Sequence, residues 1–148
     1  MPKSISSIEK SYLAGFLDAD GSIYVQAKPN DTYRFGYQVA PYIVFFQSAK
    51  DEEAFSRVCD LIKFGHTRKR KDGIIEYLIS RQEEILKLVE MLEPYVVMKK
   101  QQMALIKEII LSKQKVETEK DFEQLINLID RFRELNYSKK RKKRTLTP

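Results

Sequence analysis

Residues 13–22, which read LAGFLDADGS, constrain the fold more than any other part of the chain. Ser6 and Glu9 precede them in the Ser-x-x-Glu pattern of a capping box. This pattern, followed by apolar residues, predicts a helix from Ser7 to about Asp18. The stretch therefore carries its small and acidic residues along one helix and presents the last of them at its C-terminal end.

Two groups of residues in this helix indicate more than ordinary packing. Gly15 and Ala19 lie four apart on one face, and side chains that small let a second helix backbone approach closely. The alternative is an ordinary helix whose small residues, Ala14 included, pack on a core. Asp18 and Asp20 stand at the negative end of the helix dipole, which costs from a few tenths to about 1 kcal/mol. A divalent cation would offset that cost, and Mg²⁺ prefers carboxylate, carbonyl and water oxygens.

The segments that follow alternate as β-strands do. Residues 21–28 have a period of two, and residues 34–47 are rich in β-branched and aromatic side chains. Pro41 within the second segment indicates an edge or a bulge. A third and a fourth strand are predicted within residues 66–79, where Asp72-Gly73 is typical of a two-residue hairpin turn.

Apolar residues at helical spacing predict four further helices, at about residues 51–63, 82–92, 98–112 and 119–135. In the first of these, Ala54, Phe55, Val58, Cys59 and Ile62 share a face. The order α-β-β-α-β-β-α-α-α implies an α+β fold with a four-stranded antiparallel sheet, helices on one face and the other face open. We expect residues 1–136 to form one domain and residues 137–148 a basic C-terminal tail.

The net charge of +6 comes from the tail, because the six cations at residues 139–144 leave the rest of the chain neutral. Within the body, residues 63–71 carry five cations and no acid, whereas residues 76–95 carry five glutamates and two cations. The predicted strands are thus basic and the helices acidic. This asymmetry favours a sheet that faces a polyanion.

Several classes of site and location are disfavoured. Cys59 is the one cysteine and His66 the one histidine, which excludes an internal disulfide and a zinc site of Cys and His. The first residues lack the apolar stretch of a secretory signal, and the sequence has no run of eighteen apolar residues. We expect an intracellular protein, of an organelle or a prokaryotic cytoplasm, that binds neither a membrane nor a small-molecule cofactor.

Residues 13–22 resemble the signature of the LAGLIDADG homing endonucleases almost letter for letter, and the chain resembles the homodimeric chloroplast-intron branch through most of its length. The family fold has a saddle-shaped sheet, and its signature helices pair across a twofold axis. No second match occurs in residues 23–148, so the resemblance implies a homodimer on a long pseudopalindromic DNA site. It also implies a Mg²⁺-dependent endodeoxyribonuclease that leaves 3′ overhangs, with Mn²⁺ or Ca²⁺ able to replace Mg²⁺ for binding.

The resemblance assigns roles to individual positions. Asp20 matches the catalytic acid that binds the metal, and the carbonyl of Ala19 would join the metal shell. Gln47 matches a residue that organises water, and Lys99 a lysine near the scissile phosphate. Lys50 is the nearest candidate for a second basic catalytic residue after the second strand, although Asp51 follows it. The dimer interface is expected at Leu13, Ala14, Gly15, Leu17 and Asp18.

The open face of the sheet is expected to read DNA in the major groove, where base edges are distinguishable. By alternation and by resemblance, its contacts are Tyr24, Gln26, Lys28, Asn30, Tyr33, Arg34, Gln38, Ala40, Tyr42, Val44, Arg68, Arg70 and Glu76. Lys139 and Lys140 of the tail are expected on phosphates. A solvated sheet face is the alternative for any single residue.

Three functions are compatible with these residues. The first is a site-specific endonuclease whose double-strand breaks promote the spread of its own intron. The second is an RNA-binding maturase that helps its intron splice. The third is a DNA-binding protein of the same fold that has lost cleavage, which the presence of Asp20, Gln47 and Lys99 disfavours.

Overall fold

The computed structural model describes residues 4–136 of the chain. Its elements follow in the order α1 (Ser7–Asp20), β1 (Gly21–Pro29), β2 (Tyr37–Ser48), η1 (Ala49–Asp51), α2 (Glu52–Asp60), β3 (His66–Lys69), β4 (Ile74–Ile79), α3 (Gln82–Leu92), α4 (Lys100–Gln114) and α5 (Glu119–Leu135). Apart from the short turn η1, this is the predicted order. The α+β fold class is confirmed.

Helix α1 begins and ends as its sequence dictates. Ser6 Oγ accepts a hydrogen bond from the Glu9 N–H, and the Glu9 carboxylate accepts one from the Ser6 N–H, which completes the predicted capping box. The helix continues to Asp20, two residues beyond the prediction, and β1 starts at the next residue. Gly21 permits this abrupt change, since a Cβ there would lie 2.8 Å from the carbonyl oxygen of Leu17.

The sheet is antiparallel, in the order β1-β2-β4-β3. Strand β2 pairs with β1 over residues 37–45 and with β4 over residues 43–48. Pro41 therefore lies opposite Val25 in the part of β2 that has a neighbour on one side only, where its missing N–H costs no ladder hydrogen bond. The expectation of an edge position is correct locally, and the ladder runs through Pro41 without a bulge.

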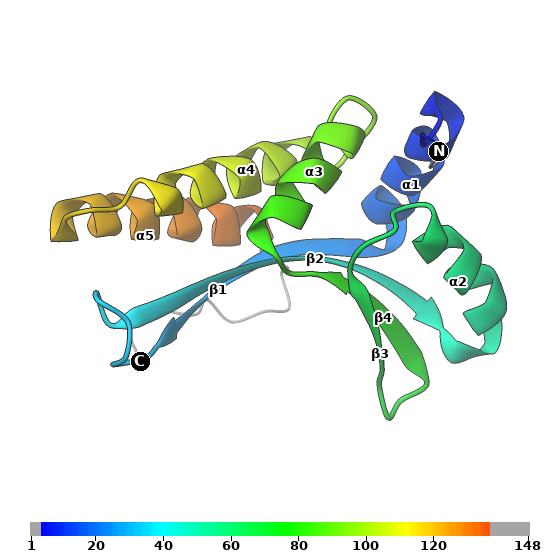
Figure 1. Cartoon of the computed structure of the whole chain (residues 1–148), viewed down its shortest axis with the longest axis horizontal. Coiled ribbons are helices and arrows are strands. Elements are labelled where there is room, and N and C mark those ends of the chain that lie inside the picture. The colour runs from blue at the N-terminus through cyan, green and yellow to red at the C-terminus, as the bar shows by residue number, and fades with distance from the viewer. Residues whose placement is uncertain (1–3, 137–148) are drawn as a thin grey trace.

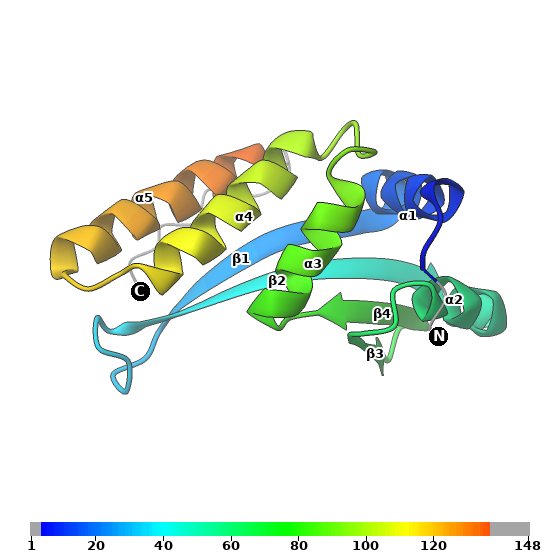
Figure 2. The same cartoon turned by 45° about the horizontal axis from the view of Figure 1, so that its top comes forward.

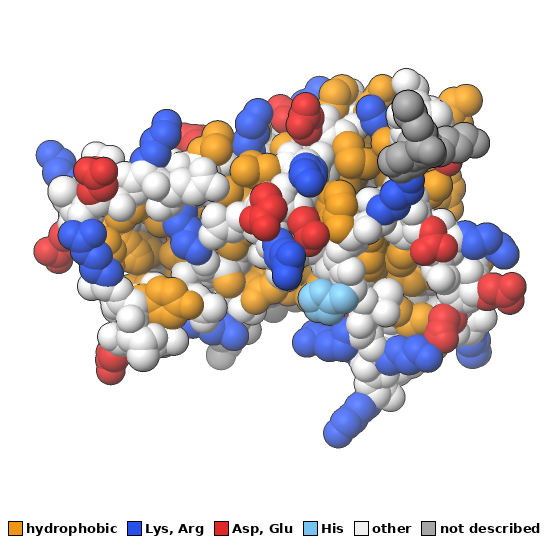
Figure 3. Space-filling model, in the orientation of Figure 1, with side chains coloured by type: hydrophobic (Ala, Val, Ile, Leu, Met, Phe, Trp, Pro, Cys, Tyr) orange, Lys and Arg blue, Asp and Glu red, His pale blue; other side chains and the backbone are white. Residues whose placement is uncertain are grey.

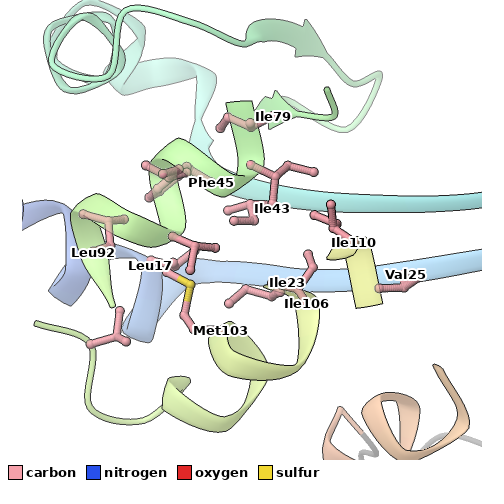
Figure 4. Close-up of a cluster of buried hydrophobic side chains, with 14 of the residues drawn as sticks. Leu17, Ile23, Val25, Ile43, Phe45, Ile79, Leu92, Met103, Ile106 and Ile110 are labelled. Atoms are coloured by element: carbon pink, nitrogen blue, oxygen red, sulfur yellow. The ribbon is translucent and has the colours of Figure 1, made fainter. Parts of the chain in front are cut away.

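The helices α1, α3, α4 and α5 cover one face of the curved sheet, and α2 lies beside its β3–β4 end (Figures 1 and 2). A core of fully buried side chains joins the two layers, among them Leu17, Ile23, Ile43, Phe45, Leu92, Met103 and Ile106 (Figure 4). Burying each such side chain contributes about 1.5–3 kcal/mol. The layers are therefore held by apolar packing on one side, and none of the helices within residues 4–136 lies on the opposite face of the sheet.

Some boundaries differ from the predictions. Strand β2 starts at Tyr37 rather than Arg34, because residues 31–36 form a turn that ends at Gly36 with φ +81°. Residues 70–73 join β3 to β4, and the Arg70 N–H donates to the Ile74 carbonyl at 2.8 Å, which leaves residues 71–73 as a three-residue turn. The Asp-Gly signal placed this turn correctly but made it one residue too short.

The helix after η1 also differs from its prediction. Helix α2 stops at Asp60 rather than near Lys63, whose φ of 73° is incompatible with a helix. Of its predicted apolar face, Phe55, Cys59 and Ile62 are buried, whereas Ala54 is exposed. Within residues 4–136, no helix is both long and apolar enough to cross a membrane.

Candidate functional site

The C-terminal end of α1 presents an exposed carboxylate. Asp20 is the last residue of the helix, and it is exposed together with Ala19. The last carbonyl groups of a helix have no partner within it, so oxygens stand next to this carboxylate. Such a set of oxygen donors suits Mg²⁺ or Ca²⁺ rather than a softer metal. Within residues 4–136 no three His, Cys, Asp or Glu side chains cluster, so a cation here would take its other ligands from carbonyls, water or a bound partner.

The other aspartate of the motif is half-buried and holds a loop. Asp18 Oδ2 accepts hydrogen bonds from the N–H groups of Val97 and Met98 at 2.7 and 3.2 Å, and Oδ1 accepts one from the N–H of Lys99 at 3.1 Å. Three consecutive backbone donors before α4 thus surround one carboxylate. Asp18 was predicted at the dimer interface, but its carboxylate is engaged within its own chain.

Lys99 reaches the same end of α1 from a distant part of the sequence. Its Nζ donates a hydrogen bond to the main-chain carbonyl of Asp18 at 3.0 Å. The ammonium therefore lies at the negative end of the α1 dipole and within two residues of Asp20 along the helix. Part of the positive charge that the two aspartates were expected to require is supplied by Lys99.

Gln47 and Lys50 follow the end of the β1–β2 ladder. Gly21, the residue after Asp20, pairs with Phe45, so Gln47 lies two residues farther along β2, or about 7 Å, on the same face as Phe45. The side chain of Gln47 accepts a hydrogen bond from the Ser48 N–H at 2.8 Å. Lys50 lies in η1 and is exposed. Gln47 therefore lies close to the point where α1 meets β1, and Lys50 lies three residues after Gln47.

The outer face of α1 differs from the predicted interface. Leu13, Ala14 and Leu17 are completely buried in the core, so they cannot meet another molecule, and their assignment to the interface was wrong. Gly15, the other residue predicted at the interface, is exposed and shares its face with Ala19. The leucines of the motif fix α1 to its own chain and leave Gly15 and Ala19 on the outward side.

Two apolar side chains that sequence reasoning missed extend this outer face. Ile8 and Tyr12 are 83% and 56% exposed, at helical spacing from Gly15 and Ala19. The spacing i, i+4, i+7 and i+11 through these four residues was the signal that could have found them. Together they form an exposed, unpartnered face on the described part of the chain, which we call the α1 outer face.

The open face of the sheet carries the even-numbered residues of β1 and β2, as predicted. Tyr24 lies opposite Tyr42, and their rings stack with centroids 4.9 Å apart. Burial raises the pKa of the Tyr24 phenol above its ordinary value, so this side chain stays neutral. Further confirmed members of this face are Gln26, Lys28, Gln38 and Ala40, through the pairs Gln26↔Ala40 and Lys28↔Gln38.

Val44 shares this face but is only 1% exposed, so its predicted contact with DNA is wrong. It lies on the central strand between Ser22 of β1 and Leu78 of β4, and neighbouring side chains cover it. This face also carries residues that were not predicted to contact DNA, among them Phe46, opposite Glu76, and His66, opposite Leu78.

The basic residues of the β3–β4 hairpin surround a buried acid. Glu76 is only 9% exposed, and its Oε1 accepts a hydrogen bond from Arg68 Nε at 2.8 Å. Arg70 Nη1 lies 3.9 Å from Glu76 Oε2, and Arg70 also pairs with Asp72 at 2.6 Å. Lys and Arg side chains gather on and around this hairpin below the sheet (Figure 3). Glu76 therefore orients two arginines rather than offering itself as an exposed contact.

The β1–β2 turn holds the remaining predicted contacts. Asn30 Oδ1 accepts hydrogen bonds from the Thr32 N–H at 3.0 Å and from its hydroxyl at 2.6 Å, so this side chain shapes the turn. The Arg34 guanidinium lies 5.0 Å from the centroid of the Phe35 ring, which packs against Phe122 of α5. Tyr33 is exposed. Lys139 and Lys140 lie outside the described residues.

The chain resembles one family of proteins. A family model described as LAGLIDADG endonuclease matches residues 13–112. Over 132 residues the chain is 31% identical to the DNA endonuclease I-CreI of Chlamydomonas reinhardtii, covering 88% of this chain and 80% of that protein. Over 100 residues it is 33% identical to the DNA endonuclease I-CvuI of Chlorella vulgaris, covering 68% of this chain and 62% of that protein. A crystal structure of I-CvuI in complex with the I-CreI target matches with a TM-score of 0.84 at 29% identity, covering 91% of this chain and 86% of that one.

Proposed function

Because the chain belongs to the LAGLIDADG endonuclease family, we propose that it is a site-specific DNA endonuclease that promotes intron homing by making double-strand breaks. One observation carries the proposal beyond family membership. The exposed Asp20 ends α1, the amine of Lys99 donates to the carbonyl of Asp18 two residues before it, and the α1 outer face runs up to the same end of the helix. An acid, a cation and a surface for a second copy thus meet at one corner of the molecule.

The active form is a homodimer that binds a long pseudopalindromic site. Each chain has a single motif helix and so a single Asp20, which would serve one DNA strand. A twofold axis along the α1 outer face brings the two Asp20 residues together, and the exposed Gly15 and Ala19 permit close approach of the helices. Two cuts in one duplex then require two copies of the chain.

Each residue at this corner has its own role in phosphodiester hydrolysis. The carboxylate of Asp20 and the carbonyl of Ala19 would hold Mg²⁺, for which Mn²⁺ or Ca²⁺ substitutes in binding. When bound, the divalent ion supplies activation of a water molecule and stabilisation of the leaving 3′-oxygen. Lys99 stabilises the charge that develops on the phosphate, Gln47 orients water, and Lys50 is a second basic group. Cutting across the minor groove leaves short 3′ overhangs.

The open face of the sheet reads the bases of the major groove. Arg68 and Arg70 suit guanine, Gln26 and Gln38 suit adenine, and Ala40 offers apolar contact to a thymine methyl group. Tyr24, Lys28, Tyr33 and Tyr42 complete this surface. The structure supports weaker roles for Asn30 and Arg34, whose side chains are engaged locally.

Residues 1–136 form the endonuclease domain, and residues 137–148 are a basic tail in which Lys139 and Lys140 contact phosphates. Since homing requires access to the genome that carries the intron, the protein acts inside an organelle or a prokaryotic cell.

A cleavage assay tests the proposal. The purified protein is incubated with Mg²⁺ and a plasmid that carries the intron-free junction of the host gene. Nicking or linearisation at one site supports the endonuclease. Specific binding without cleavage would indicate a DNA-binding protein of the same fold, and stimulated splicing of the intron RNA would indicate a maturase.

A further inference from the structure

Asp18 contacts Lys99 at both ends of that residue. Its carboxylate accepts from the Lys99 N–H at 3.1 Å, and its main-chain carbonyl accepts from Lys99 Nζ at 3.0 Å. A lysine side chain is long and visits many rotamers unless it is held in one position. A contact at each end of the same residue reduces the number of positions that its amine visits.

The loop before α4 depends on the same carboxylate. The N–H groups of Val97 and Met98 donate to Asp18 Oδ2, and these two side chains are 79% and 77% exposed, so the loop is not held by burying them. The carboxylate of Asp18 therefore fixes the backbone from which Lys99 extends.

We infer that Asp18 is a positioning residue for cleavage, which acts by holding the amine of Lys99 at the Asp20 end of α1. The inference rests on the proposed function, since it gives Lys99 its role in the reaction. The Asp18 carboxylate accepts hydrogen bonds from three backbone N–H groups of the loop, so in this inference it acts through Lys99 and not on the reacting groups. Displacement of a catalytic group by about 1 Å can lower a rate about 100-fold, so such a contact is sufficient to matter.

The variant Asp18→Asn keeps the shape of the side chain and leaves one acceptor oxygen in place of two. That oxygen cannot accept both from Val97 and Met98 and from Lys99, so the loop loses at least one hydrogen bond. We expect kcat to fall about 10- to 100-fold, while KM and Ca²⁺-supported DNA binding stay close to wild type. The thermal unfolding temperature and the oligomeric state are measured for each variant to identify misfolding.

The matched control is Asp121→Asn. Asp121 Oδ2 accepts hydrogen bonds from the N–H groups of Glu117 and Thr118 before α5. Its carboxylate therefore also holds the backbone before a helix, but it has no hydrogen bond with Lys99. This variant should lose stability without a change in kcat. A fall of kcat in both variants would mean that any loosened helix start slows the enzyme, which would overturn the inference.

A double-mutant cycle with Lys99→Met separates positioning from folding. If Asp18 acts through Lys99, then Asp18→Asn combined with Lys99→Met is no slower than Lys99→Met, within about twofold. If the rate losses of the two single variants instead multiply in the double variant, Asp18 does not act through Lys99. That result would overturn the inference but not the proposed endonuclease function. A wild-type protein that cuts no DNA would instead overturn the proposed function and the inference with it.

Discussion

Arg68 and Glu76 are directly opposite each other across the β3–β4 pair, and the guanidinium donates to Oε1 of the carboxylate through both Nε and Nη2. Arg70 lies within 3.9 Å of the other carboxylate oxygen. A buried acid thus stands between two arginines on the face that we propose to meet DNA. It lowers the positive charge of that face and fixes the direction of Arg68.

We predict that Glu76→Gln raises affinity for random DNA and lowers the preference for the specific site about tenfold. The variant removes one negative charge next to two arginines, which strengthens sequence-independent binding to phosphates. It also frees Arg68 from a fixed direction, and one well-placed arginine contact is worth about 1–3 kcal/mol of discrimination. Dissociation constants for specific and random duplexes at two salt concentrations measure both effects.

The control for this variant is Glu52→Gln. Glu52 pairs with Lys69 of the same hairpin at 2.7 Å, but Lys69 is odd-numbered and points to the opposite face of the sheet. Specificity should not change in this variant. If the ratio of specific to random binding is unchanged in Glu76→Gln, then the contact with Glu76 is not what orients Arg68 towards a base.

Asp20→Asn is expected to abolish cleavage while leaving specific DNA binding intact. The exposed carboxylate has no part in the core, so its loss affects the proposed metal site and not the fold. Since a bound metal ion supplies several kcal/mol of charge stabilisation, the cleavage rate should fall at least about 1000-fold. Single-turnover cleavage in Mg²⁺ and binding in Ca²⁺ are compared on the same duplex.

Asp60→Asn serves as the control, because Asp60 is likewise an exposed aspartate at the last position of a helix, α2. It should cut at the wild-type rate. Loss of binding together with cutting in Asp20→Asn would make Asp20 a folding residue.

Local signals in the sequence predicted most of the elements. Helices α3 and α5 have the predicted bounds, because Pro94 and the Thr118 cap lie next to regular apolar patterns. Strand β2 was predicted too long, since the turn before it is set by Gly36 and by the Asn30 side chain rather than by alternation.

The outcome for the site was different. The contact of Asp18 with residues 97–99 joins segments about eighty positions apart, and no local pattern encodes it. Val44 alternates correctly with its neighbours, yet whether such a residue is exposed depends on the strands beside it. Leu13 and Leu17 belong to a matched motif, but the motif does not state which helix face meets the sheet.

Alkaline pH should destabilise the protein through Cys59 and Tyr77. Burial raises the pKa of the Cys59 thiol to about 11, and burial also raises the pKa of Tyr77, whose hydroxyl donates to the carbonyl of Phe64. Both groups ionise at lower pH in the unfolded chain, at about 8.5 for cysteine and about 10 for tyrosine. The folded state therefore keeps protons that the unfolded state releases, and stability is complete below about pH 8.5 and falls as pH rises towards 11.

Urea unfolding at a series of pH values measures this loss. Tyr77→Phe should be less stable at neutral pH by about 1 kcal/mol, because the Phe64 carbonyl loses its donor, and it should lose less stability between pH 10 and 11. Tyr33→Phe, at an exposed position, should follow the wild type. Equal slopes for Tyr77→Phe and the wild type would exclude Tyr77 as a cause.

Gly15→Leu should separate folding from association. A Cβ at Gly15 would meet no atom within 4 Å, so the single chain has room for a side chain there, and leucine is a better helix former than glycine by about 0.5–1 kcal/mol. In the proposed dimer the same side chain would stand between two closely packed helices, where overpacking costs about 1–3 kcal/mol and raises the dissociation constant about tenfold or more. Sedimentation should therefore show a stable monomer, and a cleavage assay should show that this variant no longer cuts both strands. The control Ala104→Leu, on an exposed position of α4, should remain dimeric and active. If Gly15→Leu associates as tightly as the wild type, the two copies do not meet through the α1 outer face.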